Sequence, residues 1–166
     1  VDIHEEMTAG ELHDVLMNCG AYLITETLQD LQNGTIRRSH QKTEIEAELK
    51  PAPKIFKADC EIHWTNSIDI IYNKIRGLSP YPGAWCTLKN KTKDKQVTFK
   101  LFVSNKTNIE VASDQTKTLT KGENGILFPC SDFYLLVTEF QMEGKRRMSY
   151  GEFIAGNSID DFELID

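Results

Sequence analysis

The first part of the chain has apolar and small residues at helical spacing. Thr8 stands three residues before Glu11, which is a capping-box pair, and Asn33-Gly34 supplies a stop signal. The pattern predicts a helix over residues 8–33 whose apolar stripe needs a partner surface. The stripe consists of Leu12, Val15, Leu16, Cys19, Leu23, Ile24, Thr27, Leu28 and Leu31.

The middle of the chain lacks a clean period. Residues 35–57, "TIRRSHQKTEIEAELKPAPKIFK", are polar and contain two prolines, which favours a linker or a strap lying across a surface. A short helix is then expected from the cap position at Asn66/Ser67 to Gly77. Its apolar face is formed by Ile68, Ile71, Tyr72 and Ile75.

Beyond residue 83 the pattern becomes strand-like, with strands expected over 84–89, 96–105, 108–113, 125–130 and 133–142. In the second of these, Val97, Phe99, Leu101 and Val103 alternate with the positions between them. Several short strands separated by turns suggest a small barrel of the oligonucleotide-binding type. A last helix is expected at Ser149, with Glu152 completing its capping box. The fold class is therefore α+β.

The stretch "LSPYPGAW", residues 78–85, is unusually restricted. Proline fixes φ and keeps the preceding residue out of the helical region, so Ser79 and Tyr81 are both expected to be extended. Gly83 permits a turn there. We expect this corner to lead into the first barrel strand with Trp85 as a core anchor, and stacking of Tyr81 on a nucleotide stays an alternative.

Charge is distributed unevenly along the 166 residues, although the net charge is only −6. Residues 1–33 hold seven acidic and no basic residues, and residues 34–106 hold fourteen Lys and Arg against seven acidic residues. The last nineteen residues again hold only acidic charges. A basic middle can attract a polyanion that the net charge would repel.

The composition is that of one folded domain, or of one domain and a piece of another. No apolar run in the sequence is long enough for a membrane span, and no basic start followed by an apolar core marks a signal peptide, so we expect a cytoplasmic protein that does not bind a membrane. Isolated cysteines without a paired motif are expected to be reduced core thiols, and these are Cys19, Cys60, Cys86 and Cys130.

Candidate catalytic chemistry is absent. The histidines have no ligand-like spacing to one another or to the cysteines, so no metal site is expected. The sequence contains no phosphate-binding loop, dinucleotide fingerprint or nucleophile elbow. The residues by themselves therefore favour a binding or accessory module.

Four ordered motifs resemble the methionyl-tRNA formyltransferase family over about residues 7–157. They are "TAGELHDVLMNCGAYLITETLQDLQNGT", "PAPKIFKADCEIHWTNS", "IRGLSPYPGAW" and "EFQMEGKRRMSYGEFIAGN". The resemblance implies a C-terminal piece of such an enzyme. Residues 1–36 would be the tail of the Rossmann-like formyltransferase domain, with the long helix as its remnant. Residues 37–54 would be a linker, and residues 55–166 an oligonucleotide-binding-like β-barrel with flanking helices that helps to bind tRNA.

The activity implied is transfer of a formyl group from 10-formyltetrahydrofolate to the methionine amino group of initiator methionyl-tRNA. No residue here matches the family's catalytic or folate-binding residues, so we expect the chain alone to be inactive and to bind no cofactor. The rigid corner would then also set the angle between the barrel and the catalytic domain.

The candidate tRNA contacts are basic residues. Lys145, Arg146 and Arg147 directly precede the helix cap at Ser149, where cations are disfavoured unless an anion lies there too. We therefore expect a tRNA phosphate at this helix N-terminus; the alternative is a solvated turn whose charge is partly offset by Glu143 and Glu152. Lys54, Lys57 and Lys100 are further candidates from the basic middle of the chain.

Two alternatives stay open. Sugar-nucleotide formyltransferases and formyltetrahydrofolate dehydrogenases are related enzymes with a similar C-terminal barrel. The basic run "GKRRMS" favours the tRNA enzyme, because a sugar nucleotide needs no extended phosphate track. The other alternative is a free-standing RNA-binding module, which the unpartnered stripe of the first helix argues against.

Overall fold

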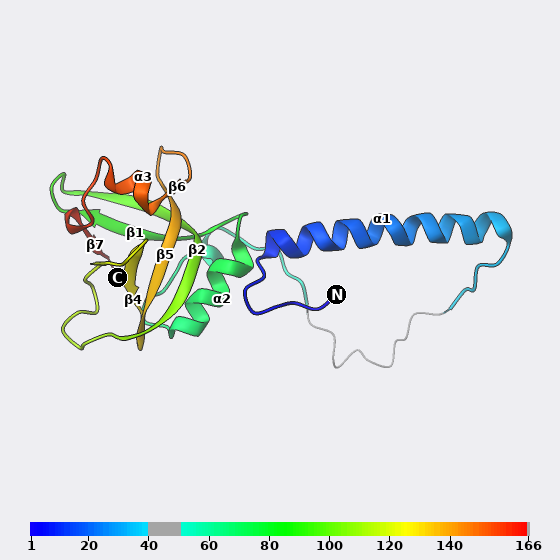
Figure 1. Ribbon diagram of the computed structural model, residues 1–166, viewed down its shortest axis with the longest axis horizontal. Coiled ribbons are helices and arrows are strands. Elements are labelled where there is room, and N and C mark those ends of the chain that lie inside the picture. Colours follow the sequence, from blue (N-terminus) through cyan, green and yellow to red (C-terminus); the bar gives the residue numbers. More distant parts are fainter. Residues whose placement is uncertain (40–50, 166) are drawn as a thin grey trace.

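The computed structural model describes residues 1–39 and 51–165. Helix α1 spans Ala9–Asn33 and projects away from a compact body that contains the sheet (Figure 1). Its capping box is the expected one, with Thr8 and Glu11 bonded reciprocally, and its end is marked by Gly34 at φ +69°. Most of the expected linker lies outside the described residues, because its residues 40–50 are not among them.

The apolar stripe of α1 is exposed, and no residue of this helix is buried. Leu16, Leu23 and Leu31 all face solvent, as expected of a helix that lacks its partner surface. The same exposure corrects one prediction, because Cys19 is an exposed thiol and not a core residue. The other three cysteines, Cys60, Cys86 and Cys130, are free and buried.

Helix α2 spans Ile68–Leu78 and buries the expected face of Ile68, Ile71, Tyr72 and Ile75. Two details differ from the sequence prediction. The helix continues through Gly77 and ends before Ser79, whose extended backbone is dictated by the following proline. The Ser67 side chain does not cap the helix, because Asp132 accepts the hydrogen bond of the Ile68 N–H at 2.8 Å.

The strands form one antiparallel sheet in the order β3-β4-β5-β2-β1-β7, with β6 paired to β5. It curls into a half-barrel, at whose open side the Leu164 N–H donates to the Lys117 carbonyl at 3.3 Å. Between the described strands β3 and β7 no ladder forms, so the expected barrel is a half-barrel. The strands are β1 Ala84–Asn90, β2 Lys95–Glu110, β3 Thr120–Lys121, β4 Ile126–Pro129, β5 Phe133–Met142, β6 Met148–Ser149 and β7 Phe162–Leu164.

Strand β2 replaces the two separate strands expected over 96–105 and 108–113. Its pairing with β5 shifts register between Leu101 and Val103, which is a β-bulge or irregularity. A bulge reverses the alternation of faces, so Phe102 is buried while Val103 is exposed. Simple alternation predicted the opposite for these two residues.

The core lies between the concave face of the sheet and the two short helices. Phe99, Phe140, Phe153 and Phe162 form a cluster of aromatic rings with centroids 5.2–6.3 Å apart. Phe153 comes from helix α3, Tyr150–Ile154, which begins at the expected Ser149–Glu152 capping box. Short 3₁₀ helices at η2 Ala58–Cys60 and η3 Ile159–Asp161 complete the body.

The two tryptophans have different roles from those expected. Trp64 is the buried one, and its ring stacks on Phe128 with centroids 4.7 Å apart. Trp85 packs against the core with only part of its surface and is half-buried. The expectation of a core anchor at Trp85 is therefore met only in part, and its remaining surface is available to a neighbouring cavity.

The beginning of α1 is fastened to the body at the proline corner. The Gly10 N–H donates to the Ser79 carbonyl at 3.0 Å, and the Arg76 guanidinium donates to the Met7 carbonyl at 3.0 Å. Lys106 on β2 bridges Glu5 and Asp69, with its Nζ 2.8 Å from a carboxylate oxygen of each. These contacts hold the start of the helix, while the rest of it is free of the body (Figure 1).

Candidate nucleic-acid interface

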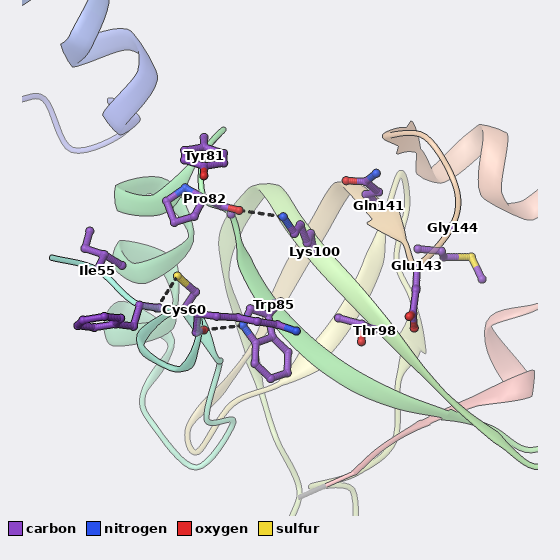
Figure 2. A pocket seen from close by; sticks show the side chains of 14 residues that line it. Ile55, Cys60, Tyr81, Pro82, Trp85, Thr98, Lys100, Gln141, Glu143 and Gly144 are labelled. Carbon is purple, nitrogen blue, oxygen red and sulfur yellow. Dashed lines mark hydrogen bonds between the residues drawn. The ribbon is translucent and has the colours of Figure 1, made fainter.

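A cavity of about 500 Å³ opens on the side of the half-barrel next to the proline corner. Figure 2 shows Trp85, Thr98 and Lys100 on the strands that form its floor. One wall comes from the segment 55–60 and the corner, and the other from the turn after β5. The lining residues are Ile55, Phe56, Lys57, Cys60, Tyr81, Pro82, Gly83, Trp85, Thr98, Lys100, Gln141, Met142, Glu143 and Gly144.

The wall formed by residues 55–60 is fixed by local hydrogen bonds. The Trp85 indole N–H donates to the Lys57 carbonyl at 2.9 Å, which ties this segment to β1. Asp59 accepts the Phe56 N–H at 2.7 Å, and the Cys60 thiol donates to the Phe56 carbonyl at 3.4 Å. A stretch that the sequence pattern assigned to a polar strap is therefore an ordered wall of the cavity.

Three of the predicted basic residues come together here. The Lys100 ammonium donates to the Pro82 carbonyl at 3.0 Å across the cavity (Figure 2). The Lys57 Nζ lies 5.6 Å from the centroid of the Trp85 ring, within the range of a cation–π contact. The Lys54 Nζ lies 5.4 Å from the centroid of the Phe56 ring.

Lys145 is exposed and directly follows Gly144, the last lining residue of the opposite wall. Its carbonyl accepts the Gln141 side-chain amide at 2.7 Å, which closes the turn. One acidic residue, Glu143, also lines this wall. Lys57, Lys100 and Glu143 are the charged lining residues, and Lys54, Lys145 and Asp59 lie next to lining residues in sequence. Positive charge is therefore in excess, which favours an anion.

Arg146 and Arg147 are arranged differently from the prediction. Arg146 pairs with Glu152 at 2.5 Å, and Arg147 pairs with Glu139 at 2.6 Å while lying 4.6 Å from the Phe102 ring centroid. The N-terminus of α3 is occupied by the Ser149–Glu152 capping box. The hydrogen bond from the Ser149 N–H, followed by Arg146, lowers the pKa of Glu152. A phosphate at this helix end, which stays a prediction, would compete with Glu152 and Glu139, because these carboxylates pair with the two arginines and Glu152 accepts the Ser149 N–H.

Of the aromatic residues at this site, the sequence pattern offered only Tyr81 as an alternative nucleotide contact, whereas Phe56 and the exposed part of Trp85 were not assigned. Phe56 is 61% exposed and Tyr81 is 84% exposed, and both line the same cavity as half-buried Trp85. The available signal was an aromatic residue between two lysines in "KIFK" and a second one between two prolines in "PYP". Their convergence is a tertiary feature that neither stretch reveals alone.

Metal centres and membrane spans are two further possibilities for residues 1–39 and 51–165. In these ranges no cluster of three or more His, Cys, Asp or Glu side chains is arranged to hold a metal ion. None of the helices in the same ranges combines the length and the apolar character needed to cross a membrane.

Curated relatives match almost the entire chain. Methionyl-tRNA formyltransferase from Flavobacterium johnsoniae is 35% identical over 97% of this chain and 50% of its own length. The enzymes of the same name from Clostridium acetobutylicum and Phocaeicola vulgatus are 36% and 37% identical over 96% and 93% of this chain. The chain therefore spans about half the length of the curated relatives it matches.

Solved structures resemble this chain in fold. A crystal structure of a HypX variant from Aquifex aeolicus superimposes with a TM-score of 0.66 at 14% identity, over 95% of this chain and 27% of HypX. A structure of HypX in complex with tetrahydrofolic acid has a TM-score of 0.56 over 86% of this chain and 26% of HypX. At such low identity the likeness shows the fold alone.

The same body of the molecule is identified by a family model. The model is described as formyl transferase, C-terminal domain, and it matches residues 54–158, which is well over half of the chain. The matched residues include all four lysines around the cavity and the whole proline corner. The chain belongs to the formyl transferase C-terminal domain family.

Proposed function

We propose that this chain is the C-terminal half of a methionyl-tRNA formyltransferase and that its half-barrel holds tRNA. The complete enzyme would transfer a formyl group from 10-formyltetrahydrofolate to the methionine amino group of initiator methionyl-tRNA. Relatives of that name aligned over more than nine tenths of the chain support this reading over the sugar-nucleotide and dehydrogenase alternatives.

The proposal divides the chain as the sequence resemblance does. Residues 1–36 are the end of the formyltransferase domain, residues 37–54 the linker, and residues 55–166 the tRNA-binding domain. Support for the first assignment comes from the exposed apolar stripe of α1, which is suited to packing against another domain. Formyl transfer and folate binding belong, in this proposal, to the half of the relatives' length that the chain does not span.

One observation carries the tRNA proposal. Lys57 and Lys100 line a single cavity, and Lys54 and Lys145 flank it on opposite sides, although these residues are far apart in sequence. Lysine side chains gathered on one exposed face are the usual means of binding a phosphate backbone, because they displace its counterions. We therefore assign the backbone contacts to these four lysines.

Arg146 and Arg147 would make weaker contacts with tRNA than the lysines. Their carboxylate partners are partly exposed, and such surface pairs contribute little stability. A phosphate could therefore replace Glu152 or Glu139 as the partner at small cost. These two arginines should contribute less to tRNA binding than the cavity lysines, which have no carboxylate partner to give up among the described ion pairs.

The test is the salt dependence of tRNA affinity. Lys57→Ala and Lys100→Ala should each weaken binding of initiator tRNA and reduce the slope of log K against log salt by about one per lost phosphate contact. The matched control is Lys91→Ala in the exposed turn between β1 and β2, which does not line the cavity. Equal slopes for all four proteins would remove the cavity from the tRNA path.

Activity provides a second test. The chain alone should give no formyl transfer to methionyl-tRNA above the no-enzyme blank, because no residue of it has been assigned a catalytic role. Turnover in a clean preparation would contradict that assignment. Restored turnover on addition of the N-terminal half of a relative would support the division of labour.

A further inference from the structure

The cavity carries more exposed aromatic surface than binding of a phosphate backbone requires. Tyr81 is 84% exposed and Phe56 is 61% exposed, and both line a space that half-buried Trp85 also borders. Tyr81 is not a loose loop tip, because Pro80 and Pro82 flank it and restrict the backbone on both sides. An exposed aromatic ring on a restricted backbone beside a cavity is a platform for another flat ring.

We propose that this cavity takes an unpaired nucleobase of the bound RNA, stacked on the aromatic side chains that line it, with Tyr81 as the main platform. The adjoining phosphates would then face Lys57 and Lys100. The inference rests on the proposed function and extends it, because it names the part of the RNA that is bound: a single-stranded nucleotide in addition to the backbone.

The combination of groups fits this ligand. Lysines beside aromatic rings are how proteins bind single-stranded nucleic acid, where each base offers a flat face for stacking. In a duplex these faces are covered by the neighbouring base pairs, so the same rings select for unpaired nucleotides. The hydroxyl of Thr98 and the side-chain carbonyl of Gln141 lie on the cavity surface and provide polar groups for a base edge.

Charge argues for this occupant over an apolar protein segment. Two lysines, Lys57 and Lys100, line the cavity against the single lining acid Glu143, and Lys54, Lys145 and Asp59 lie next to lining residues in sequence, so positive charge is in excess. An apolar helix would fill the aromatic surface but would leave this positive charge without a partner. A nucleotide satisfies both, since it joins a ring and a phosphate in one unit.

The experiment compares two RNA probes on the full 166-residue chain. One is a single-stranded RNA of about ten nucleotides, and the other is a fully paired duplex of the same length, both measured between about 50 and 200 mM salt. Tyr81→Ala is the test variant. Tyr22→Ala is the matched control, because Tyr22 is also exposed, at 65%, but lies on α1 far from the cavity (Figure 1).

We expect tighter binding of the single strand than of the duplex. Tyr81→Ala should lower the affinity for the single strand by about fivefold or more, which is the lower end of the effect of losing one stacked base. The affinity for the duplex should stay unchanged. Tyr22→Ala should change neither. Quenching of tryptophan fluorescence by the single strand should accompany binding, because Trp85 borders the cavity whereas Trp64 is buried.

Two results would overturn the inference without touching the proposed function. One is equal affinity for both probes with Tyr81→Ala indistinguishable from Tyr22→Ala, while Lys57→Ala still weakens both probes. The other is a free mononucleotide that binds as tightly as the oligonucleotide, which would assign the cavity to a soluble nucleotide. Failure of the chain to bind either RNA at any salt concentration would instead overturn the proposed function itself.

Discussion

Gly10 in the first turn of α1 lies so close to Pro80 that a Cβ on Gly10 would be 2.5 Å from the Pro80 Cδ. The Gly10 N–H also donates to the carbonyl of Ser79, the residue before that proline. The restricted corner therefore does more than turn the chain into β1. The first turn of α1 packs directly against it. Glycine is required at position 10 because the Pro80 ring cannot move aside to make room for a Cβ.

Gly10→Ala should separate α1 from the corner. A Cβ–Cδ distance of 2.5 Å is not tolerated, and neither a proline ring nor the backbone behind it gives way easily. We expect the Gly10 amide and its neighbours to exchange hydrogen faster with solvent, while amides of β2 and β5 keep their protection. Hydrogen exchange followed by mass spectrometry measures both in one sample.

The same helix offers a matched control for that substitution. Gly20 has no atom within 4 Å of its would-be Cβ, so Gly20→Ala relieves the cost of glycine in a helix without a clash. It should stabilise α1 by about 0.5–1 kcal/mol. Unchanged exchange in Gly10→Ala, or an equal effect of both substitutions, would show that the corner does not hold the helix.

Lys106→Met should release the N-terminal segment. The Lys106 ammonium bonds to both Glu5 and Asp69, and these contacts raise the pKa of Lys106 and lower the pKa of Glu5. In the wild-type protein, proteolysis within residues 1–7 should become faster as salt screens these pairs. In Lys106→Met it should be fast at all salt concentrations. A cleavage rate independent of both salt and the substitution would contradict this.

Glu152 should link the stability of α3 to acid pH. Its pKa is lowered in the folded protein, first by the Ser149 N–H and then by Arg146, so its stabilising effect is complete above the ordinary carboxyl value. That effect is lost as the pH falls through the lowered pKa. A carboxyl titration by NMR should show the lowered value, and Arg146→Met should move it part of the way back. Titration of Glu152 at or above the ordinary glutamate value would refute the capping role.

Three of the cysteines, Cys19, Cys86 and Cys130, should react with iodoacetamide in a fixed order. Cys19 is exposed on α1, whereas burial raises the pKa of Cys86 and of Cys130 to about 12. Because the thiolate is the reactive form, Cys19 should be alkylated first at a pH of about 8, with Cys86 and Cys130 protected until the protein unfolds. Peptide mass spectrometry checks the order, and early modification of Cys86 would mean that the half-barrel opens.

Local signals predicted the starts of α1 and α3 well, but not both ends of α2. The pairs Thr8–Glu11 and Ser149–Glu152 were visible in sequence because a capping box involves residues only three positions apart. The bulge in β2 was not visible, because it depends on pairing with β5 and not on β2 alone. The burial of Phe102 in place of Val103 follows from that pairing.

At the candidate site, too, residue types could be predicted from local sequence, whereas their spatial arrangement could not. Lys54, Lys57 and Lys100 could be proposed from charge, but nothing in the sequence placed them around one cavity with Tyr81 and Trp85. Glu152 beside the arginines could be named from sequence, but the ion pair of Arg147 with Glu139 could not. The partner of Arg147 is Glu139 on the preceding strand, which reaches it only because β5 pairs with β6.

Because α1 contacts the described body of the molecule only at its first turn, a small tilt there moves its far end by a much larger distance. Its 25 residues extend for about 37 Å at about 1.5 Å per residue. A displacement of about 1 Å across the first turn, which rises about 5.4 Å, is magnified to about 7 Å at the far end. The close approach of Gly10 to Pro80 thus fixes the direction of the α1 axis relative to the half-barrel, and with it the position of any surface that packs along α1. The orientation of a partner bound along α1 would therefore depend on a contact, between Gly10 and Pro80, that the partner does not touch.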